Sequence, residues 1–289
     1  MTTQTVPVFG LSYGPSSYGK TADAGLAFPT ALFFVRKGGL KSITALGGFM
    51  PHSVEVSDLD DAAKVLRENQ GKYPAFVFDE FDFLVEDTFR KYERRFSGYK
   101  LFGELKRAVL NFRNDVRETP GHVWLTALEK GPKLKDDGTK IRGGPALTGD
   151  LPEKLPAMCD LVLRASRDPM RRPWAGIYRL DVNSSDWVGK DRDNGTPDPA
   201  PMNVGEILRF NGYDLPRLPS LPWQEGVVAG IHAKLIDVEE EQEPEIAQEW
   251  YAKLIGQGIG PQAARWTVRD ALDRTLLHRA AAIRNANYY

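Results

Sequence analysis

The stretch that decides the fold is "VFGLSYGPSSYGKTADAGLAF", which runs from Val8 to Phe28. It begins as an apolar strand, continues into a loop, and ends in small residues with little charge. The loop "GPSSYGKT" matches the phosphate-loop (P-loop) pattern G-x-x-x-x-G-K-[ST] in full. In such loops backbone N–H groups and the positive end of the following helix point at phosphate oxygens. We therefore predict a nucleotide-binding loop made of Gly14, Pro15, Ser16, Ser17, Tyr18, Gly19, Lys20 and Thr21.

The residue types in this loop predict ATP and Mg²⁺ as cofactors. Lys20 is predicted to reach the β- and γ-phosphates as a catalytic residue, and Thr21 to bind the metal. A second metal ligand is expected after a neighbouring strand, and in "AFVFDEFDFL" at 75–84 the apolar residues lead into Asp79 and Glu80. We expect Asp79 to hold the metal and Glu80 to orient or deprotonate the attacking water. The alternatives are an ordinary glycine-rich turn and a buried strand that ends in solvated acids.

The rest of the chain predicts an α/β fold with a mostly parallel central sheet flanked by helices. Apolar runs that suit doubly buried strands lie at 6–11, 31–35, 75–84, 122–128 and 160–165. Helical patterns lie between them, at 57–69 with Ser57 or Asp58 as N-cap, and at 98–118. The segment 178–201 reads as one or two strands that close in a polar turn.

A change of character near Pro216 divides the chain into two predicted domains, 1–215 and 216–289. The second begins with a proline-rich connector, "LPRLPSLPW", followed by an acidic run at 237–249 that we interpret as a solvated spacer or as a competitor for basic loops. A helix is expected from Pro261, with Ala264, Val268, Leu272 and Leu276 on one stripe.

With these motifs placed, residues 6–211 resemble the RecA-like phage ATPases that act in single-strand annealing and recombination. The order of parts carries the resemblance: the P-loop with a very short helix and a proline, then "FVFDEFDFL", "HVWLTALEK", and "GPALTGDLPEKLPAMCDLVLRA", in which a proline-bearing loop precedes an apolar strand. The resemblance implies a homo-oligomer, and it assigns the turn "VGKDRDNGTP" catalytic fingers, Lys190 and Arg192, that reach the neighbouring subunit's γ-phosphate. A solvated hairpin turn is the alternative.

One departure concerns the base that activates water. Many relatives carry an acidic residue soon after the second strand, where this chain has Arg36 and Lys37. Glu80 or Glu129 then has to act as the base, or turnover is slow and the protein is a nucleotide-gated binder. Thr126 is expected either to sense the γ-phosphate or to be a buried structural residue.

Two basic segments are predicted to bind single-stranded DNA. Segment 90–107 has seven bases against two acids, with interleaved aromatic residues, and segment 129–150 is a glycine-rich loop with scattered bases. The candidate contacts are Arg90, Lys91, Arg94, Arg95, Lys133, Lys135, Lys140 and Arg142. Amphipathic helices also collect exposed bases over core aromatics, which is the alternative for the first segment.

Together these features predict an ATP-hydrolysing phage recombination or annealing protein, stimulated by DNA and able to contact a phage or host replication or single-strand-binding protein. The alternatives are a non-hydrolysing nucleotide switch in replication or packaging, and a P-loop small-molecule kinase. The chain has one cysteine and no basic-apolar leader or membrane span, so we expect the cytoplasm of an infected host cell.

Overall fold

A mostly parallel sheet forms the centre of the molecule. The structure, a computed structural model, describes residues 6–36, 40, 51–167, 176–193, 195–215 and 222–286. Its strands are β1 (Phe9–Gly14), β2 (Leu32–Val35), β3 (His52–Glu55), β4 (Ala75–Asp79), β5 (His122–Lys130), β6 (Lys133–Leu134), β7 (Lys140–Ile141), β8 (Gly144–Pro145), β9 (Leu161–Arg167), β10 (Gly176–Arg179), β11 (Lys190–Asp191) and β12 (Ala200–Pro201). Among the described residues, the main sheet has the order β12-β10-β9-β1-β5-β4-β2-β3. Strands β9, β1, β5, β4, β2 and β3 pair in parallel, which confirms the predicted fold class.

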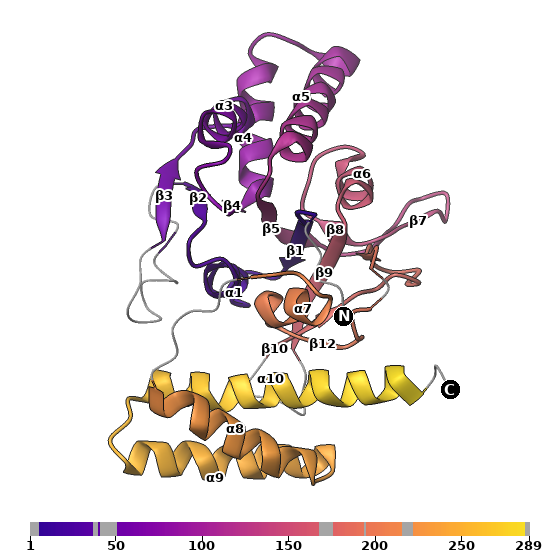
Figure 1. Cartoon of the computed structure of the whole chain (residues 1–289). Coiled ribbons are helices and arrows are strands. Elements are labelled where there is room, and N and C mark those ends of the chain that lie inside the picture. Colours follow the sequence, from indigo (N-terminus) through magenta and orange to yellow (C-terminus); the bar gives the residue numbers. More distant parts are fainter. Residues whose placement is uncertain are drawn as a thin grey trace.

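Helices cover both faces of this sheet (Figure 1). The helices of the described residues are α1 (Lys20–Ala27), α3 (Leu59–Asn69), α4 (Phe81–Glu93), α5 (Gly98–Glu118), α6 (Leu151–Met158), α7 (Val204–Phe210), α8 (Pro222–Ile236), α9 (Glu243–Gly256) and α10 (Pro261–Ala286). Helices α3, α4, α5 and α6 share one apolar cluster with the sheet, and α1 and α7 share another. The result is a helix–sheet–helix arrangement.

Strand β4 shows why its residues suit a sheet buried on both faces. Successive side chains of a strand point to opposite faces. Phe76 and Phe78 accordingly join the α3–α6 cluster, while Ala75 and Val77 join the α1–α7 cluster. All four side chains are buried, so the continuous apolar run reflects burial on both sides.

The two helices predicted from periodicity form as expected. Helix α3 begins after Asp58, whose carboxylate accepts hydrogen bonds from the N–H groups of Asp60 and Asp61 at 2.9 and 3.1 Å. Helix α5 has the predicted bounds and buries its predicted stripe, which consists of Leu101, Leu105, Val109 and Phe112.

Three local predictions are wrong. The strand expected at 75–84 ends at Asp79, and the residues from Phe81 form α4 because Phe81, Leu84, Val85 and Thr88 are buried at helical spacing. The strand expected at 6–11 lies instead at Phe9–Gly14, where it stays paired with β5 up to Gly14. The proline-bearing loop expected before β9 contains helix α6, which tolerates Pro152 because that residue lies in its first turn.

The C-terminal helices α8, α9 and α10 enclose an apolar cluster of their own, which includes Val228, Ile231, Leu254, Val268 and Leu272. Helix α10 also packs against β12 and α7 of the sheet-containing part (Figure 1). On its predicted stripe Leu276 is half-buried, and the neighbouring Leu277 is buried instead.

The acidic run is folded rather than an extended spacer, since most of it forms a short 3₁₀ turn and the start of α9. Its acids other than Glu243 are exposed to solvent, as predicted. Its Glu243 is buried and pairs with Arg279 at 2.8 Å. The proline-rich connector at 216–221 lies outside the described residues.

Candidate functional site

The predicted P-loop connects the end of β1 to the start of α1. Gly19, the N-cap of α1, has φ 91°, a left-handed conformation that favours glycine. Gly14 is required for a different reason, because a Cβ at this position would lie 2.7 Å from the Cβ of Ala165 on β9. The two glycines thus allow the loop to curl closely over the neighbouring strand before the helix begins.

Lys20 is folded across the loop. Its ammonium donates hydrogen bonds to the carbonyl oxygens of Gly14 at 3.0 Å and Pro15 at 2.8 Å, and only 5% of the residue is exposed. Burial lowers the pKa of Lys20, while the nearby carboxylates of Glu80 and Asp79 oppose that change. The lysine is therefore held at the loop by acceptors that a phosphate oxygen can replace.

Thr21 and Asp79 meet, although 58 residues separate them in the chain. The Thr21 hydroxyl donates to Asp79 Oδ1 at 2.8 Å, and the Thr126 hydroxyl donates to the same oxygen at 2.5 Å. Because β5 lies between β1 and β4, its Thr126 occupies the space between the P-loop and Asp79. Burial raises the pKa of Asp79 to about 6. A hydroxyl beside a carboxylate is the oxygen donor set that Mg²⁺ prefers, so these residues fit the predicted ion.

Three further carboxylates lie near the Lys20 ammonium: Glu80, Asp82 and Glu129. Glu80 is half-buried and occupies the N-cap position of α4 without a side-chain capping hydrogen bond, and the peptide bond before it is cis. Asp82 is buried, accepts a hydrogen bond from the Leu128 N–H at 3.2 Å, and has its pKa raised to about 6 by burial. Burial also raises the pKa of the half-buried Glu129.

Sequence analysis missed Asp82 because it treated 75–84 as one strand. In the structure this residue lies in the first turn of α4, and its carboxylate reaches back to β5. The helical spacing of Phe81, Leu84 and Val85 is the signal that would have placed it.

A family model described as "AAA domain" matches residues 7–192, which contain the P-loop, Asp79 and Thr126. The chain belongs to the AAA domain family. It is therefore a P-loop NTPase by family. A comparison with curated proteins gives no match. No helix in the described ranges has the length and apolar character needed to cross a membrane.

Two solved structures show some similarity to this AAA domain protein. One is a RadB recombinase with 18% identity and a TM-score of 0.39, over 61% of this chain and 82% of that chain. The other is a KaiC-like protein from the hyperthermophilic archaeon Pyrococcus horikoshii OT3, with 12% identity and a TM-score of 0.40, over 61% of this chain and 85% of that chain.

Lys190 and Arg192 lie far from the P-loop of their own AAA domain. Lys190 donates to the Ala157 carbonyl at 2.7 Å, and Arg192 pairs with Asp160 at 2.6 Å. Asp160 in turn accepts a hydrogen bond from the Phe9 N–H, at the start of β1. The P-loop follows the other end of that strand, about 16 Å away at 3.3 Å per residue. Arg192 is thus placed near the end of β1 opposite the P-loop, while Lys190 pairs through β11 with Val162, which is level with Leu11 on β1.

Arg36 follows β2, at the position where many members of the family that the sequence resembles carry an acidic residue. It pairs with Asp87 of α4 at 3.1 Å and lies 4.9 Å from the centre of the Phe83 ring. Its guanidinium thus packs against α4. Lys37 lies outside the described residues.

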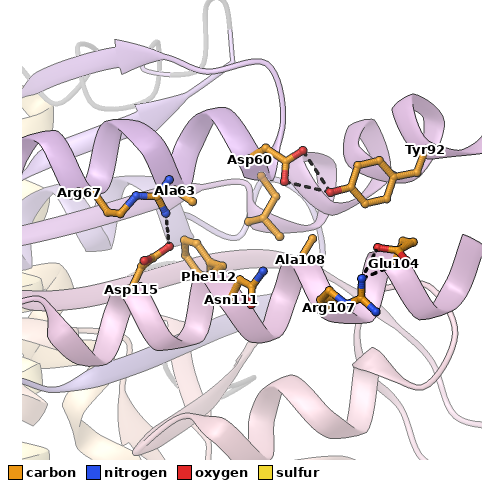
Figure 2. A pocket seen from close by; sticks show the side chains of 11 residues that line it. Asp60, Ala63, Arg67, Tyr92, Glu104, Arg107, Ala108, Asn111, Phe112 and Asp115 are labelled. Atoms are coloured by element: carbon orange, nitrogen blue, oxygen red, sulfur yellow. Dashed lines mark hydrogen bonds and ion pairs between the residues drawn. The ribbon is translucent and has the colours of Figure 1, made fainter. Parts of the chain in front are cut away.

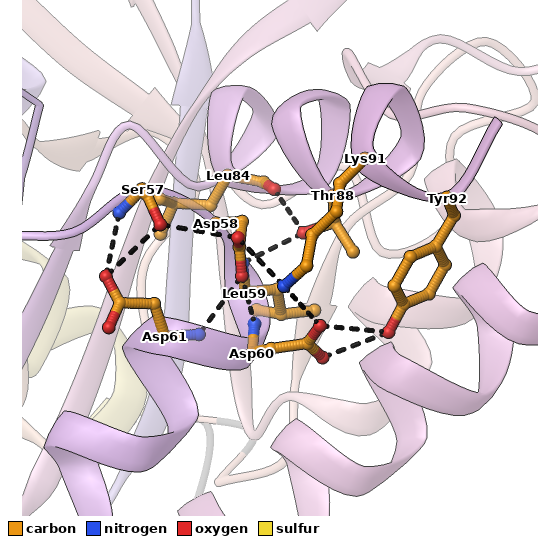
Figure 3. A network of polar contacts seen from close by, with 9 residues as sticks. All are labelled: Ser57, Asp58, Leu59, Asp60, Asp61, Leu84, Thr88, Lys91 and Tyr92. Atoms are coloured by element: carbon orange, nitrogen blue, oxygen red, sulfur yellow. Dashed lines mark hydrogen bonds and ion pairs between the residues drawn. The ribbon is translucent and has the colours of Figure 1, made fainter. Parts of the chain in front are cut away.

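Lys91, one of the predicted DNA contacts, is part of a polar network (Figure 3). Its ammonium binds Asp58 at 3.0 Å and Asp60 at 2.8 Å, and Tyr92 donates to Asp60 as well. The charge of Lys91 is therefore balanced within the chain. Arg90, one residue earlier, pairs with Glu86 at 2.5 Å.

Arg94 and Arg95 differ from these two residues. Both are exposed at the end of α4, and within the described part of the chain neither forms an ion pair. Tyr99 is 99% exposed at the start of α5, and Lys100 lies 5.1 Å from the centre of the Phe96 ring. The helix connection thus presents unpaired guanidinium groups beside exposed aromatic rings.

The second predicted DNA segment folds as a hairpin rather than as an open loop. Strands β6 and β7 pair antiparallel around an Asp137–Gly138 turn, in which Gly138 has φ 79°. Lys133, Lys135 and Arg142 are exposed, while Lys140 forms an ion pair with Asp186. The hairpin follows β5, whose Glu129 lies near the Lys20 ammonium.

The two basic segments approach each other at helices α5 and α6. A Cβ on Gly149 would lie 3.8 Å from Phe102, and Phe102 is 46% exposed. Next to this contact, Lys154 forms an ion pair with Asp150, and the nearby ammonium of Lys106 lowers the pKa of Lys154. The sequence did not indicate that Lys106 and Lys154 are neighbours, because they are 48 positions apart.

A pocket of about 300 Å³ lies on the outer side between α3 and α5 (Figure 2). Its charged lining residues are all paired: Arg67 binds Asp115 at 2.6 Å, Arg107 binds Glu104 at 3.1 Å, and Asp60 binds Lys91, which lies outside the lining, at 2.8 Å. Because these charges are already balanced, we assign the pocket no ligand.

Proposed function

We propose that this AAA domain protein binds and hydrolyses ATP and uses it to anneal or recombine single-stranded DNA, as an oligomer in phage replication. The observation that carries the proposal is the meeting of Lys20, Thr21 and Asp79 at one end of the sheet. These side chains supply one cation and two oxygen ligands at the start of a helix, which suits a Mg²⁺-bound triphosphate.

In this proposal each residue has a defined role. Lys20 exchanges the carbonyl oxygens of Gly14 and Pro15 for β- and γ-phosphate oxygens, and Thr21 and Asp79 hold Mg²⁺. When bound, the ion neutralises charge on the phosphates. Glu80 orients the attacking water, and Asp82 and Glu129 are the other carboxylates close to Lys20. Lys190 and Arg192 act on the neighbouring subunit, which accounts for their distance from their own P-loop.

The DNA part of the proposal is supported by two exposed basic segments. Arg94, Arg95, Tyr99 and Phe102 lie along the α4–α5 connection, and the basic hairpin follows β5. Unpaired cations suit phosphates, and exposed rings suit stacked bases without sequence preference.

The experiment is the ATPase rate with and without single-stranded DNA, with oligomer size measured on the same samples. We expect DNA to stimulate turnover, and we expect Arg94→Ala with Arg95→Ala to weaken both the stimulation and DNA affinity. Lys64→Ala with Lys72→Ala is the matched control, because it removes two exposed charges from another part of the surface. Unchanged DNA affinity in the Arg94/Arg95 variant, or turnover indifferent to DNA, overturns the recombination proposal.

A second candidate function is a nucleotide switch that does not hydrolyse ATP. This function is favoured by Arg36, because it packs against α4 at the position where relatives carry the acidic residue that activates water. The same experiment separates the two functions: a switch binds ATP through Lys20 and shows no turnover with or without DNA.

A further inference from the structure

A buried carboxylate joins the P-loop helix to the C-terminal helices. Asp23 lies on α1, two residues after Thr21, and is 1% exposed. The Tyr178 hydroxyl donates to it at 2.7 Å, and the Val204 N–H donates at 3.2 Å. Its cationic partner is Arg269 of α10, whose guanidinium lies 3.7 Å from Asp23 Oδ1.

Arg269 also holds the segment between β12 and α7. It donates a hydrogen bond to the Met202 carbonyl and pairs with Asp273 at 3.4 Å. Asp273 accepts a hydrogen bond from the Asn203 side chain at 3.2 Å. One arginine of α10 thus contacts both α1 and the β12–α7 segment.

That segment lies directly against the P-loop. A Cβ on Gly19 would be 3.9 Å from the Met202 methyl carbon, and a Cβ on Gly205 would be 3.3 Å from Ala27 at the other end of α1. Helix α1 is short, and Lys20 and Thr21 form its first turn together with Asp23. A shift of α1 therefore displaces Lys20 and Thr21 together.

We propose that Arg269 is a positioning residue for the P-loop, through which the C-terminal helices α8–α10 set the affinity for nucleotide. The proposal rests on nucleotide binding at Lys20, and it adds that α10 determines how tightly that site binds. Without Arg269, Asp23 keeps its two neutral donors and loses its cation, and α1 is no longer fixed to α10. A molecule that binds α8–α10 and moves α10 would then change nucleotide affinity from outside the site.

The test measures the dissociation constant of a fluorescent ATP analogue with Mg²⁺ on the full chain. We expect Arg269→Gln to raise it about tenfold, which corresponds to about 1.4 kcal/mol. Arg269→Lys, which keeps the charge, should recover part of the loss. Arg274→Gln is the matched control: it removes an arginine that pairs with Glu225 and Asp270 within the C-terminal helices, and it should change the constant less than about twofold.

A double-mutant cycle separates positioning from general loosening of the fold. If Arg269 acts through Asp23, then Asp23→Asn combined with Arg269→Gln binds no more weakly than the weaker single variant. The proposal is overturned if the fold-increases in the dissociation constant caused by the two single changes multiply in the double variant. It is also overturned if Arg269→Gln and Arg274→Gln raise the dissociation constant equally. Failure of the proposed function looks different, because the wild-type protein then binds no nucleotide or binds it equally well with Lys20→Ala.

Removing one partner of a buried ion pair can prevent folding. If Arg269→Gln does not fold, hydrogen–deuterium exchange of the wild-type protein tests whether nucleotide binding at the P-loop is coupled to α10. Addition of ATP and Mg²⁺ should slow amide exchange in α10 around Arg269 as well as in α1. Slower exchange in α1 with no change in α10 overturns the proposal.

Discussion

At the scale of single residues, the candidate site contains some residues that short sequence motifs predict and others whose contacts appear only in the folded structure. Lys20, Thr21 and Asp79 were predictable because each lies at a strand end or helix start that a short pattern defines. Asp23 was not, because its partners Tyr178 and Arg269 are more than 150 positions away. Nothing in the local sequence indicates that this acid is buried.

The buried carboxyls predict how stability depends on pH in the absence of nucleotide and metal. Burial raises the pKa of Asp23 to about 7, from an ordinary value near 4. The folded chain then keeps a proton that the unfolded chain has released, so the free energy of unfolding falls as pH rises from about 4 to about 7. Asp79 and Asp82 add to this fall up to pH about 6. Urea unfolding at a series of pH values measures it.

Asp23→Asn provides the comparison for this pH dependence. In this variant the free energy of unfolding should fall less between pH 6 and pH 7 than in the wild-type protein, because asparagine carries no proton to release. Asp137→Asn, at an exposed position in the hairpin, should leave the fall as steep as in the wild-type protein. A wild-type protein whose stability rises through this range would show that these acids are ionised in the fold.

At the scale of elements, two glycines with opposite surroundings test the packing of the P-loop. Gly14→Ala forces a Cβ to 2.7 Å from Ala165, and overpacking of this kind costs about 1–3 kcal/mol of unfolding free energy. Gly103 lies in α5 with nothing within 4 Å of its Cβ position, so Gly103→Ala should stabilise by roughly 0.5–1 kcal/mol. Chemical denaturation measures both. Equal changes in the two variants would contradict the close approach of β1 and β9.

Helices and strands were predicted correctly where the apolar residues of a segment follow a single spacing, that of a helix or that of a strand. The prediction failed where one apolar segment contains both spacings. Helix α5 has a single apolar stripe, and its bounds match the prediction. The residues 75–84 contain a strand and a helix start in one apolar run, which hid the boundary at Asp79. In the acidic run, charge correctly indicated exposure for every acid except Glu243, which is buried and pairs with Arg279 of another helix.

At the scale of the whole molecule, Arg192 lies near the opposite end of β1 from the P-loop. If it acts on a neighbouring subunit, Arg192→Gln should lower ATP turnover by about a thousandfold, as removal of arginine fingers does, and leave nucleotide binding nearly unchanged. A steady-state ATPase assay, together with a binding titration of the same protein, measures both effects.

Mixing two inactive variants tests whether the finger acts between subunits. Lys20→Ala subunits keep the fingers and Arg192→Gln subunits keep the P-loop, so their mixed oligomers contain some complete sites and should regain activity. Each variant mixed with itself is the control. Mixed oligomers that form and stay as inactive as the separate variants would place Arg192 outside the catalytic machinery.

The two predicted domains, 1–215 and 216–289, remain a proposal at this scale. The C-terminal helices have their own apolar cluster, which favours the division, and Arg269 ties them to α1.

The central claim is that ATP and Mg²⁺ bind at the P-loop through Lys20, Thr21 and Asp79. Isothermal titration of ATP, with and without Mg²⁺, into the wild-type, Lys20→Ala and Asp79→Asn proteins tests it most directly. We predict that the wild-type protein binds ATP more tightly with Mg²⁺, that Lys20→Ala abolishes binding, and that Asp79→Asn removes the effect of Mg²⁺. Wild-type affinity in Lys20→Ala would contradict the account.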